Sequence, residues 1–358
     1  MARVGIFGLP NVGKTTLFNA LTGLAAPTAA HPYSTTEPNI GVAKVLDDRL
    51  DRAAQVEHSA KTVRATLDLL DLPAMTGPAG GGFGGQFLGR LREMEALVGV
   101  LRAFTDEGVT DADSGIDPAA QAENLLLELI LADAEVFARR AERAVKEAGA
   151  DAAKKAFASS VQRGADHLAG GAPMRTGSWA PEDLAAFRDM APLTLKPTVW
   201  VVNVGEDEAD RAGLLAAVEA VVPPGDVVVT LSAAIEEEAA LLDPADRAEL
   251  LEGLGLGEGA LATMVRAVYS AVGLISFFTL GPKEAHEWTV RRGATAPEAA
   301  GKIHTDFERG FIRVDVCPIE SVIEAGGWGP AKTGGKVRLE GKDYVVAEGD
   351  VIEVRFSV

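Results

Sequence analysis

The sequence predicts an α/β protein with a doubly wound, mostly parallel sheet, an inserted helical hairpin and a small C-terminal mixed sheet. The chain opens with a short apolar segment, a glycine-rich turn and apolar residues at helical spacing. Later segments have the nearly continuous apolar character of parallel strands covered on both faces. Their spacing leaves room for helices between them, as a doubly wound sheet requires.

Five strand-like segments define the first domain. Residues 2–8 come first, and the helical pattern TTLFNALTGL follows the glycine-rich turn. The other four segments are residues 63–72, 96–104, 196–204 and 226–234. Because they lie on both sides of a long helical stretch, we assign residues 1–117 and 191–273 to one domain with an insertion.

The insertion, residues 118–190, is rich in Ala, Leu, Glu and Arg and has no strand signal. From Pro118 onward, apolar residues recur at helical spacing; they include Leu125, Leu129, Ala132 and Val136. The segment Gly149–Asp151 has the composition of a turn. The sequence therefore predicts an antiparallel pair of helices, a coiled-coil hairpin.

Residues 274–358 form the third predicted domain, a small mixed sheet with one helix. Alternating apolar and polar residues indicate strands, with turn signals at Glu340–Gly341 and Glu348–Gly349. The segment TAPEAAGKIHTDFERG is typical of a helix.

Composition restricts the class of protein. Of the 358 residues, 47% are apolar, and no uncharged apolar run is long enough to span a membrane, so we expect a soluble, cytoplasmic protein. The single cysteine, Cys317, excludes internal disulfides and cysteine-rich zinc sites. The net charge of −18 disfavours nucleic-acid binding over the whole surface. Residues 274–358 carry 11 basic and 13 acidic side chains, so this part is the better candidate for RNA contact.

The segment GLPNVGKT, residues 8–15, satisfies G-x-x-x-x-G-K-[ST] between a predicted strand and a predicted helix. Glycines let several backbone N–H groups point at phosphate oxygens, and the helix adds the positive end of its dipole. Lysine neutralises the outer phosphates, and the hydroxyl that follows it holds Mg²⁺. The phosphate site is therefore predicted to comprise Gly8, Asn11, Val12, Gly13, Lys14, Thr15 and Thr16.

Four further segments complete the predicted site. HPYSTTEPN is similar to the first switch of translation-factor-type GTPases, in which a threonine completes the magnesium shell, and we assign that role to Thr35. Asp71, in LLDLPAM, occupies the place of the D-x-x-G switch and is expected behind the metal. The base-reading segments NVGE and SAA each follow an apolar strand; they contribute Asn203, Val204, Glu206, Ser232 and Ala233.

Together these segments resemble the YchF/Obg-like ATPases, a branch of the P-loop NTPases. The resemblance spans the chain and includes GLPNVGKTTLFNALT, TEPNIGV, LKPTVWVVNVGED, GATAPEAAGKIHTDFERGFIR and EGKDYVV. It implies a P-loop NTPase domain with Mg²⁺ as cofactor. It also implies a coiled-coil insertion and a TGS domain, a β-grasp (ubiquitin-like) fold, at the C-terminus.

The resemblance favours ATP over GTP, and the residues supply a reason. GTPases present N-K-x-D, whose short aspartate accepts from two guanine donors. Here Asn203 is followed three residues later by Glu206, whose longer carboxylate cannot take the same position without a shift. Asn203 is left with two alternatives, a hydrogen bond to the base edge or a brace for the loop.

Hydrolysis is expected to be slow because the second switch diverges. The glycine of the family's D-x-A-G is replaced by Ala74, and Met75 stands where Ras-like enzymes place a glutamine. Where the family implies a catalytic histidine, alignment places Asp111, a candidate for orienting water. Lys14 is the other predicted catalytic residue. The alternatives to a slow ATPase are a GTPase of the Obg-related type and a nucleotide-sensing scaffold with little or no hydrolysis.

The resemblance also implies a ribosomal partner, on the large subunit, with contacts to rRNA or tRNA through the TGS and coiled-coil domains. Basic residues of the third domain are compatible with such contacts; they include Arg291, Arg292, Lys302, Arg309 and Arg313. His304 lies in a family-like segment but has no assigned role. We expect a monomer that does not associate with membranes.

Overall fold

The computed structural model divides into two compact units. The residues whose structure is described are 2–26, 38–72, 84–105, 116–206, 208–254 and 259–357. The first unit comprises those of residues 2–42 and 68–264, and the second comprises those of residues 43–67 and 265–357.

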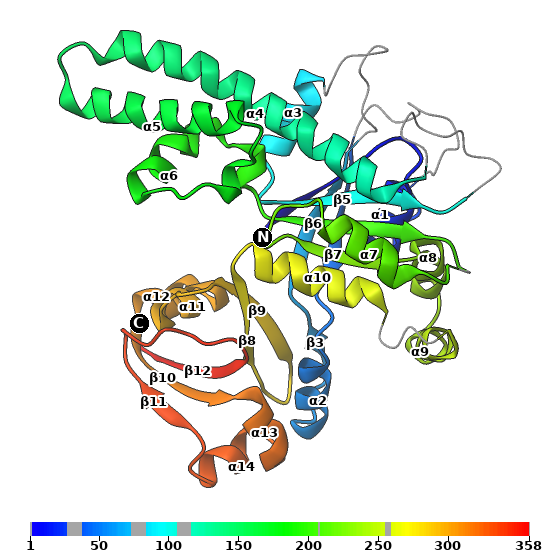
Figure 1. The fold of residues 1–358 in the computed structure, drawn as a ribbon. Helices are drawn as coiled ribbons and strands as arrows, with labels where there is room; N and C mark the ends of the chain where they lie inside the picture. The colour runs from blue at the N-terminus through cyan, green and yellow to red at the C-terminus, as the bar shows by residue number, and fades with distance from the viewer. Residues whose placement is uncertain are drawn as a thin grey trace. The chain divides into compact units, whose positions relative to one another are not determined.

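A six-stranded sheet organises the first unit, with the order β2-β4-β1-β5-β6-β7. Figure 1 labels three neighbouring strands of it, β5, β6 and β7. The pairs β4–β1, β1–β5, β5–β6 and β6–β7 are parallel, so the prediction of a mostly parallel sheet is confirmed. The strands are β1 (Arg3–Phe7), β2 (Asn39–Lys44), β4 (Thr66–Asp71), β5 (Ala96–Ala103), β6 (Thr198–Val204) and β7 (Val227–Leu231). Strand β2, at the sheet edge, is the one that the apolar pattern did not indicate.

Helices connect and cover these strands. They are α1 (Lys14–Thr22), α3 (Gly85–Arg92), α7 (Arg211–Glu219), α8 (Ala233–Ala240) and α9 (Pro244–Gly253). Helix α10 (Ala260–Ala271) continues from the first unit into the second. Side chains of α3 and α7 share one apolar cluster with Phe7 of β1. Val4 and Ile6, which point to the opposite face because strand side chains alternate, are also fully buried. Both faces of the sheet are therefore covered, as the nearly continuous apolar strands predicted.

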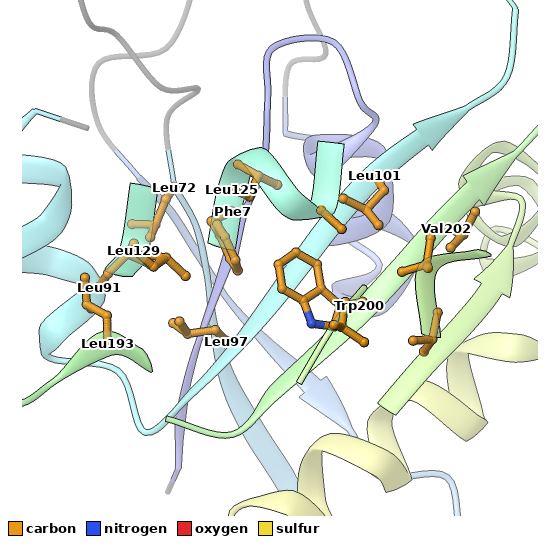
Figure 2. Packing of buried hydrophobic residues seen from close by; sticks show 14 of the residues in the cluster. Phe7, Leu72, Leu91, Leu97, Leu101, Leu125, Leu129, Leu193, Trp200 and Val202 are labelled. Carbon is orange, nitrogen blue, oxygen red and sulfur yellow. The ribbon is translucent and has the colours of Figure 1, made fainter. Parts of the chain in front are cut away.

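Trp200 on β6 is the largest fully buried side chain of the protein's described part. Its ring meets Phe7 edge to face, with centroids 5.8 Å apart, and Figure 2 shows it among the leucines of the same cluster. Its indole N–H donates to Asp226 Oδ2 at 2.8 Å. Gly99 on β5 lies directly beneath the ring, and a Cβ there would come within 2.6 Å of Trp200 Cε3. The absence of a side chain at Gly99 thus makes room for the indole.

The insertion forms the predicted helical hairpin. Helices α4 (Pro118–Ala148) and α5 (Ala152–Ala169) run side by side (Figure 1). Asp117 and Asp151 cap their N-termini by accepting backbone N–H bonds. Shorter helices return the chain to the sheet; they are η1 (Met174–Thr176), α6 (Pro181–Phe187), η2 (Arg188–Met190) and η3 (Leu193–Leu195).

Asp133, fully buried on α4, fixes the base of the hairpin. Its two carboxylate oxygens accept from the backbone N–H groups of Leu193 and Thr194, at 3.0 and 2.8 Å. Arg92 of α3 pairs with the same carboxylate at 2.8 Å. A buried charge requires such partners, and here they attach the hairpin to the chain segment that enters β6.

The second unit contains a mixed sheet with the order β11-β10-β12-β8-β9-β3. Strand β12 is parallel to β8 and antiparallel to β10, as expected for a mixed sheet. The strands are β3 (Thr62–Val63), β8 (Leu274–Thr279), β9 (Ala285–Arg291), β10 (Phe311–Pro318), β11 (Arg338–Glu340) and β12 (Asp350–Phe356). Cys317 is fully buried in this unit.

Residues 43–67 pack with the C-terminal part of the chain, whereas the sequence interpretation assigned them to the first domain. Their helix α2 (Asp48–Val56) buries Leu50, Ala53 and Ala54 in a cluster with Phe278 and Val322. Arg49 also pairs with Glu348 at 2.5 Å. Amphipathic spacing indicates a helix but does not identify the distant surface against which it packs.

The prediction of one helix in the third domain was wrong. The segment TAPEAAGKIHTDFERG forms two helices, α11 (Ala296–Ile303) and α12 (Thr305–Arg309). His304 between them is extended, and its Nδ1 accepts from the backbone N–H of Asp306 at 3.1 Å. This residue therefore caps α12. Two more helices follow β10, α13 (Ile319–Ala325) and α14 (Trp328–Thr333).

Within the described part of the chain, no helix combines the length and apolar character needed to cross a membrane. In the same residues, no three His, Cys, Asp or Glu side chains are grouped as metal ligands.

Glu287 on β9 is a buried carboxyl in the second unit, only 1% exposed. Its Oε1 accepts from Ser276 Oγ at 2.7 Å, and its Oε2 accepts from the Ala65 N–H at 3.1 Å. Burial raises the pKa of this carboxyl to about 7, although both hydrogen bonds act in the opposite direction.

Replacing Glu287 with glutamine should stabilise the second unit above pH 7 by about 2 kcal/mol. An unfolded glutamate titrates near 4.5, so the folded state takes up a proton between that value and about 7. The carboxyl's contribution to the stability of the folded state is therefore fully present below pH 4.5 and is lost as the pH rises through 7. Glutamine keeps an acceptor for Ala65 and a donor for Ser276. Urea unfolding at pH 5 and pH 8 measures the effect, and equal stabilisation at both values would contradict it.

Candidate nucleotide-binding site

The glycine-rich loop lies between β1 and α1, as predicted. Gly8 and Gly13 adopt positive φ values of 154° and 92°, and Asn11 lies at 59°. A Cβ at Gly8 would approach the Val100 carbonyl oxygen to 2.5 Å, and one at Gly13 would clash with the Asn203 amide. Both glycines are therefore required by backbone conformation and by close packing.

Lys14 begins α1 and is only 7% exposed. Its Nζ donates to the carbonyl oxygens of Gly8 and Leu9, at 3.2 and 2.8 Å. Burial lowers the pKa of the ammonium to about 8, and the nearby Asp71 carboxylate partly offsets this effect. The loop thus holds a poorly solvated cation, the kind of group that an anionic phosphate stabilises.

The Thr15 hydroxyl and the Asp71 carboxylate meet behind the loop. Thr15 Oγ1 donates to Asp71 Oδ2 at 2.8 Å, and Asp71, at the end of β4, is 5% exposed. Because the hydroxyl proton is engaged by Asp71, the oxygen lone pairs of Thr15 remain for a cation. A hydroxyl and a carboxylate are oxygen ligands of the kind that Mg²⁺ prefers, so these residues fit the expected metal.

Asn203, at the end of β6, braces the loop. Its Nδ2 donates to the Val12 carbonyl oxygen at 2.9 Å, and its Oδ1 accepts from the Ala233 N–H at the same distance. One side chain therefore joins the phosphate loop to the segment after β7. Of the two roles considered for Asn203, the structure shows the brace, and the second N–H of its amide remains for a base edge.

The other base-reading candidates differ in exposure. Ser232, the N-cap residue of α8, is buried, and Val204 is buried within β6. Glu206 is exposed on the loop that follows β6. Among these residues, Glu206 has the carboxylate that is free to turn toward a bound base.

Three predicted site residues, Thr35, Ala74 and Asp111, lie outside the described residues, as does Met75. The assignments of the two switches and of the water-orienting residue therefore stay predictions.

The structure adds one site residue, Asn39, and one buried asparagine of α1, Asn19, that the sequence reasoning did not single out. Asn39, at the start of β2, donates to Asp71 Oδ2 at 3.0 Å. Asn19 on α1 both donates to and accepts from the Ala26 backbone, and it also donates to Glu237 of α8 at 2.8 Å. Each lies in a segment that carried the family resemblance, TEPNIGV for Asn39 and GKTTLFNALT for Asn19, but neither segment reveals its side-chain partners.

Family models match both ends of the chain. The model described as "50S ribosome-binding GTPase" matches residues 3–132. The model described as "Protein of unknown function (DUF933)" matches residues 274–357.

Individual proteins match almost the whole chain. It is 41% identical to "Ribosome-binding ATPase YchF" of Escherichia coli O157:H7, over 99% of both chains. It is 35% identical to "Obg-like ATPase 1" of Oryza sativa subsp. japonica, over 99% of this chain and 92% of that protein. The solved structure of the Schizosaccharomyces pombe YchF GTPase superposes with a TM-score of 0.86 at 29% identity, covering 99% of this chain and 97% of that chain. The chain therefore belongs to the YchF/Obg-like ATPase family.

Proposed function

We propose that this protein is a nucleoside triphosphatase that binds ATP in preference to GTP, hydrolyses it slowly with Mg²⁺, and acts on the ribosome. The observation that carries the proposal is the arrangement around the glycine-rich loop. A buried ammonium, a hydroxyl backed by a carboxylate, and an asparagine brace converge there from three separated segments. Such a site supplies the positioning and charge neutralisation on which phosphoryl transfer depends.

Each predicted residue has a proposed role at this site. The backbone of Gly8, Asn11, Val12 and Gly13 wraps the phosphates, and Lys14 neutralises them. Mg²⁺, when bound, would supply positive charge that offsets the charge of the phosphates. Thr15 and Thr35 would hold the metal, and Asp71 orients Thr15. The remaining proposed contacts are Thr16 and Ala74 near the phosphates and Val204, Ser232 and Ala233 near the base.

Two experiments separate this function from its alternatives, the first at ATP concentrations that saturate both proteins. Single-turnover release of phosphate from Mg·ATP should be slow but faster than with the Lys14→Met variant. Equal rates would leave a nucleotide-sensing scaffold as the function, with Asp111 playing no catalytic part. A preference for GTP in competition against ATP would instead support a conventional GTPase.

Glu206 is the residue on which the base preference depends. The Glu206→Asp variant should shift the ratio of GTP to ATP affinity toward GTP by about tenfold, or ~1.4 kcal/mol. The shorter carboxylate restores the acceptor that guanine's two donors require. Competition between the two nucleotides for one labelled nucleotide measures the ratio. Glu219→Asp, an exposed site on α7, is the matched control. A ratio within twofold of wild type would contradict the role of Glu206.

The ribosomal partner is supported by relatives named ribosome-binding ATPase and by the family model that matches residues 3–132. We propose the large subunit as the target, with the α4–α5 hairpin and the C-terminal TGS-like unit touching rRNA or tRNA. A monomer in the cytoplasm is the form that we expect to bind. Co-sedimentation with separated subunits in ATP and ADP tests this, and binding to the small subunit alone would refute it.

A further inference from the structure

One oxygen of the Asp71 carboxylate receives two hydrogen bonds from different parts of the chain. Thr15 Oγ1 of α1 donates to Oδ2 at 2.8 Å, and Asn39 Nδ2 of β2 donates to the same atom at 3.0 Å. Asp71 is buried, so its orientation is set by these protein donors more than by water.

The fold brings Asn39 to this position through close packing of β2 on α1. A Cβ at Gly41 would come within 2.6 Å of Thr22 and 2.7 Å of the Phe18 ring, both on α1. Because side chains of a strand alternate, Asn39 lies on the same face of β2 as Gly41, toward the helix. Ile40, on the other face, is 70% exposed. Gly41 therefore allows the approach that puts the Asn39 amide against Asp71.

The chemistry of an amide suits this position. It donates to a carboxylate without adding a charge, so Asp71 keeps its negative charge for a cation and for the Thr15 hydroxyl. Groups that orient metal ligands from behind typically change metal affinity by about 10- to 100-fold when removed.

We propose that Asn39 is a positioning residue for Mg²⁺: it holds the Asp71 carboxylate in the orientation that directs Thr15 toward the metal. The proposal rests on the Mg²⁺-dependent nucleotide binding described above. It assigns Asn39 no contact with nucleotide, so the affinity measured without metal should not depend on this residue.

The test is the affinity for a fluorescent ATP analogue, measured across a series of Mg²⁺ concentrations and in excess EDTA. In Asn39→Ala, the Mg²⁺ concentration that gives half of the metal-dependent gain in analogue affinity should rise about tenfold or more. The affinity in EDTA should stay within twofold of the wild-type value. Ile40→Ala, at the exposed neighbouring position, should match wild type in both measurements. In an Asp71→Asn background, Asn39→Ala should cause no further shift, because the oriented carboxylate is already gone.

Several results would overturn the inference. One is an unchanged Mg²⁺ midpoint in Asn39→Ala, and another is an equal loss of affinity with and without metal, which indicates a general structural role. If Asn39→Ala does not fold, Asn39→Ser, whose hydroxyl is too short to reach Asp71, must show the same shift. If nucleotide binding by the wild-type protein does not respond to Mg²⁺, the metal dependence of the proposed function is refuted. This outcome is distinct from a failure of the role proposed for Asn39.

Discussion

The Lys14→Met variant should bind ATP about 100-fold more weakly than wild type, a loss of roughly 3 kcal/mol. Lys14 is the buried cation of the loop, and its ammonium is held by the carbonyl oxygens of Gly8 and Leu9. Methionine fills a similar volume without the charge, so the phosphates lose their main partner in a poorly solvated site. Calorimetric titration with Mg·ATP measures the loss.

Folding of the free protein should not suffer from this change. Burial lowers the pKa of Lys14, so the folded state disfavours its charged form before any phosphate is present. The melting temperature without nucleotide should therefore equal or exceed that of wild type. Lys154→Met, on the exposed face of α5, controls for the loss of a positive charge. An unchanged ATP affinity in Lys14→Met would refute the assignment of the loop.

The parts of the fold that depend on local sequence were predictable. The loop from Gly8 to Thr15 can be recognised from the sequence alone because its glycines, lysine and threonine lie within eight consecutive residues. Likewise, β5 and β6 are buried along their whole length, so their nearly continuous apolar sequences identify them. Local signals of this kind need no knowledge of distant partners.

Features that depend on distant partners were not predictable. Leu50 of α2 is buried against residues more than 220 positions away, and its helical spacing fits a helix on either unit. Asn39 and Asp71 are 32 positions apart, and their hydrogen bond depends on how closely β2 approaches α1. The break at His304 was missed because histidine is an uncommon N-cap residue.

Asn203 illustrates an intermediate case. Its place at the end of an apolar strand indicated the base-reading loop, and the strand is where it was expected. The choice between base contact and brace required the positions of Val12 and Ala233, which follow other strands of the sheet. The sequence thus located the residue, and the tertiary structure defined one of its roles.

Trp200→Ala should destabilise the first unit by about 4 kcal/mol, the largest effect on stability that we expect. The change removes a fully buried indole, its edge-to-face contact with Phe7 and its hydrogen bond to Asp226. Rigid neighbouring strands cannot close the resulting space completely. Urea unfolding followed by far-UV circular dichroism gives the value, and a loss below about 1.5 kcal/mol would show that the core relaxes around the gap.

Gly99 provides a sharper test of the same packing. The effect of Gly99→Ala on the free energy of unfolding should change sign when Trp200 is replaced. In wild type, Gly99→Ala puts a methyl group within 2.6 Å of the indole and should cost about 1–3 kcal/mol. In the Trp200→Ala background the two closest contacts are gone and the Phe7 ring, 3.2 Å away, can shift into the vacated space. The methyl group then fills part of that space while reducing the freedom of the unfolded chain. There, Gly99→Ala should be neutral or stabilising. An equal cost in both backgrounds would mean that the strain at Gly99 comes from the strand itself and not from Trp200.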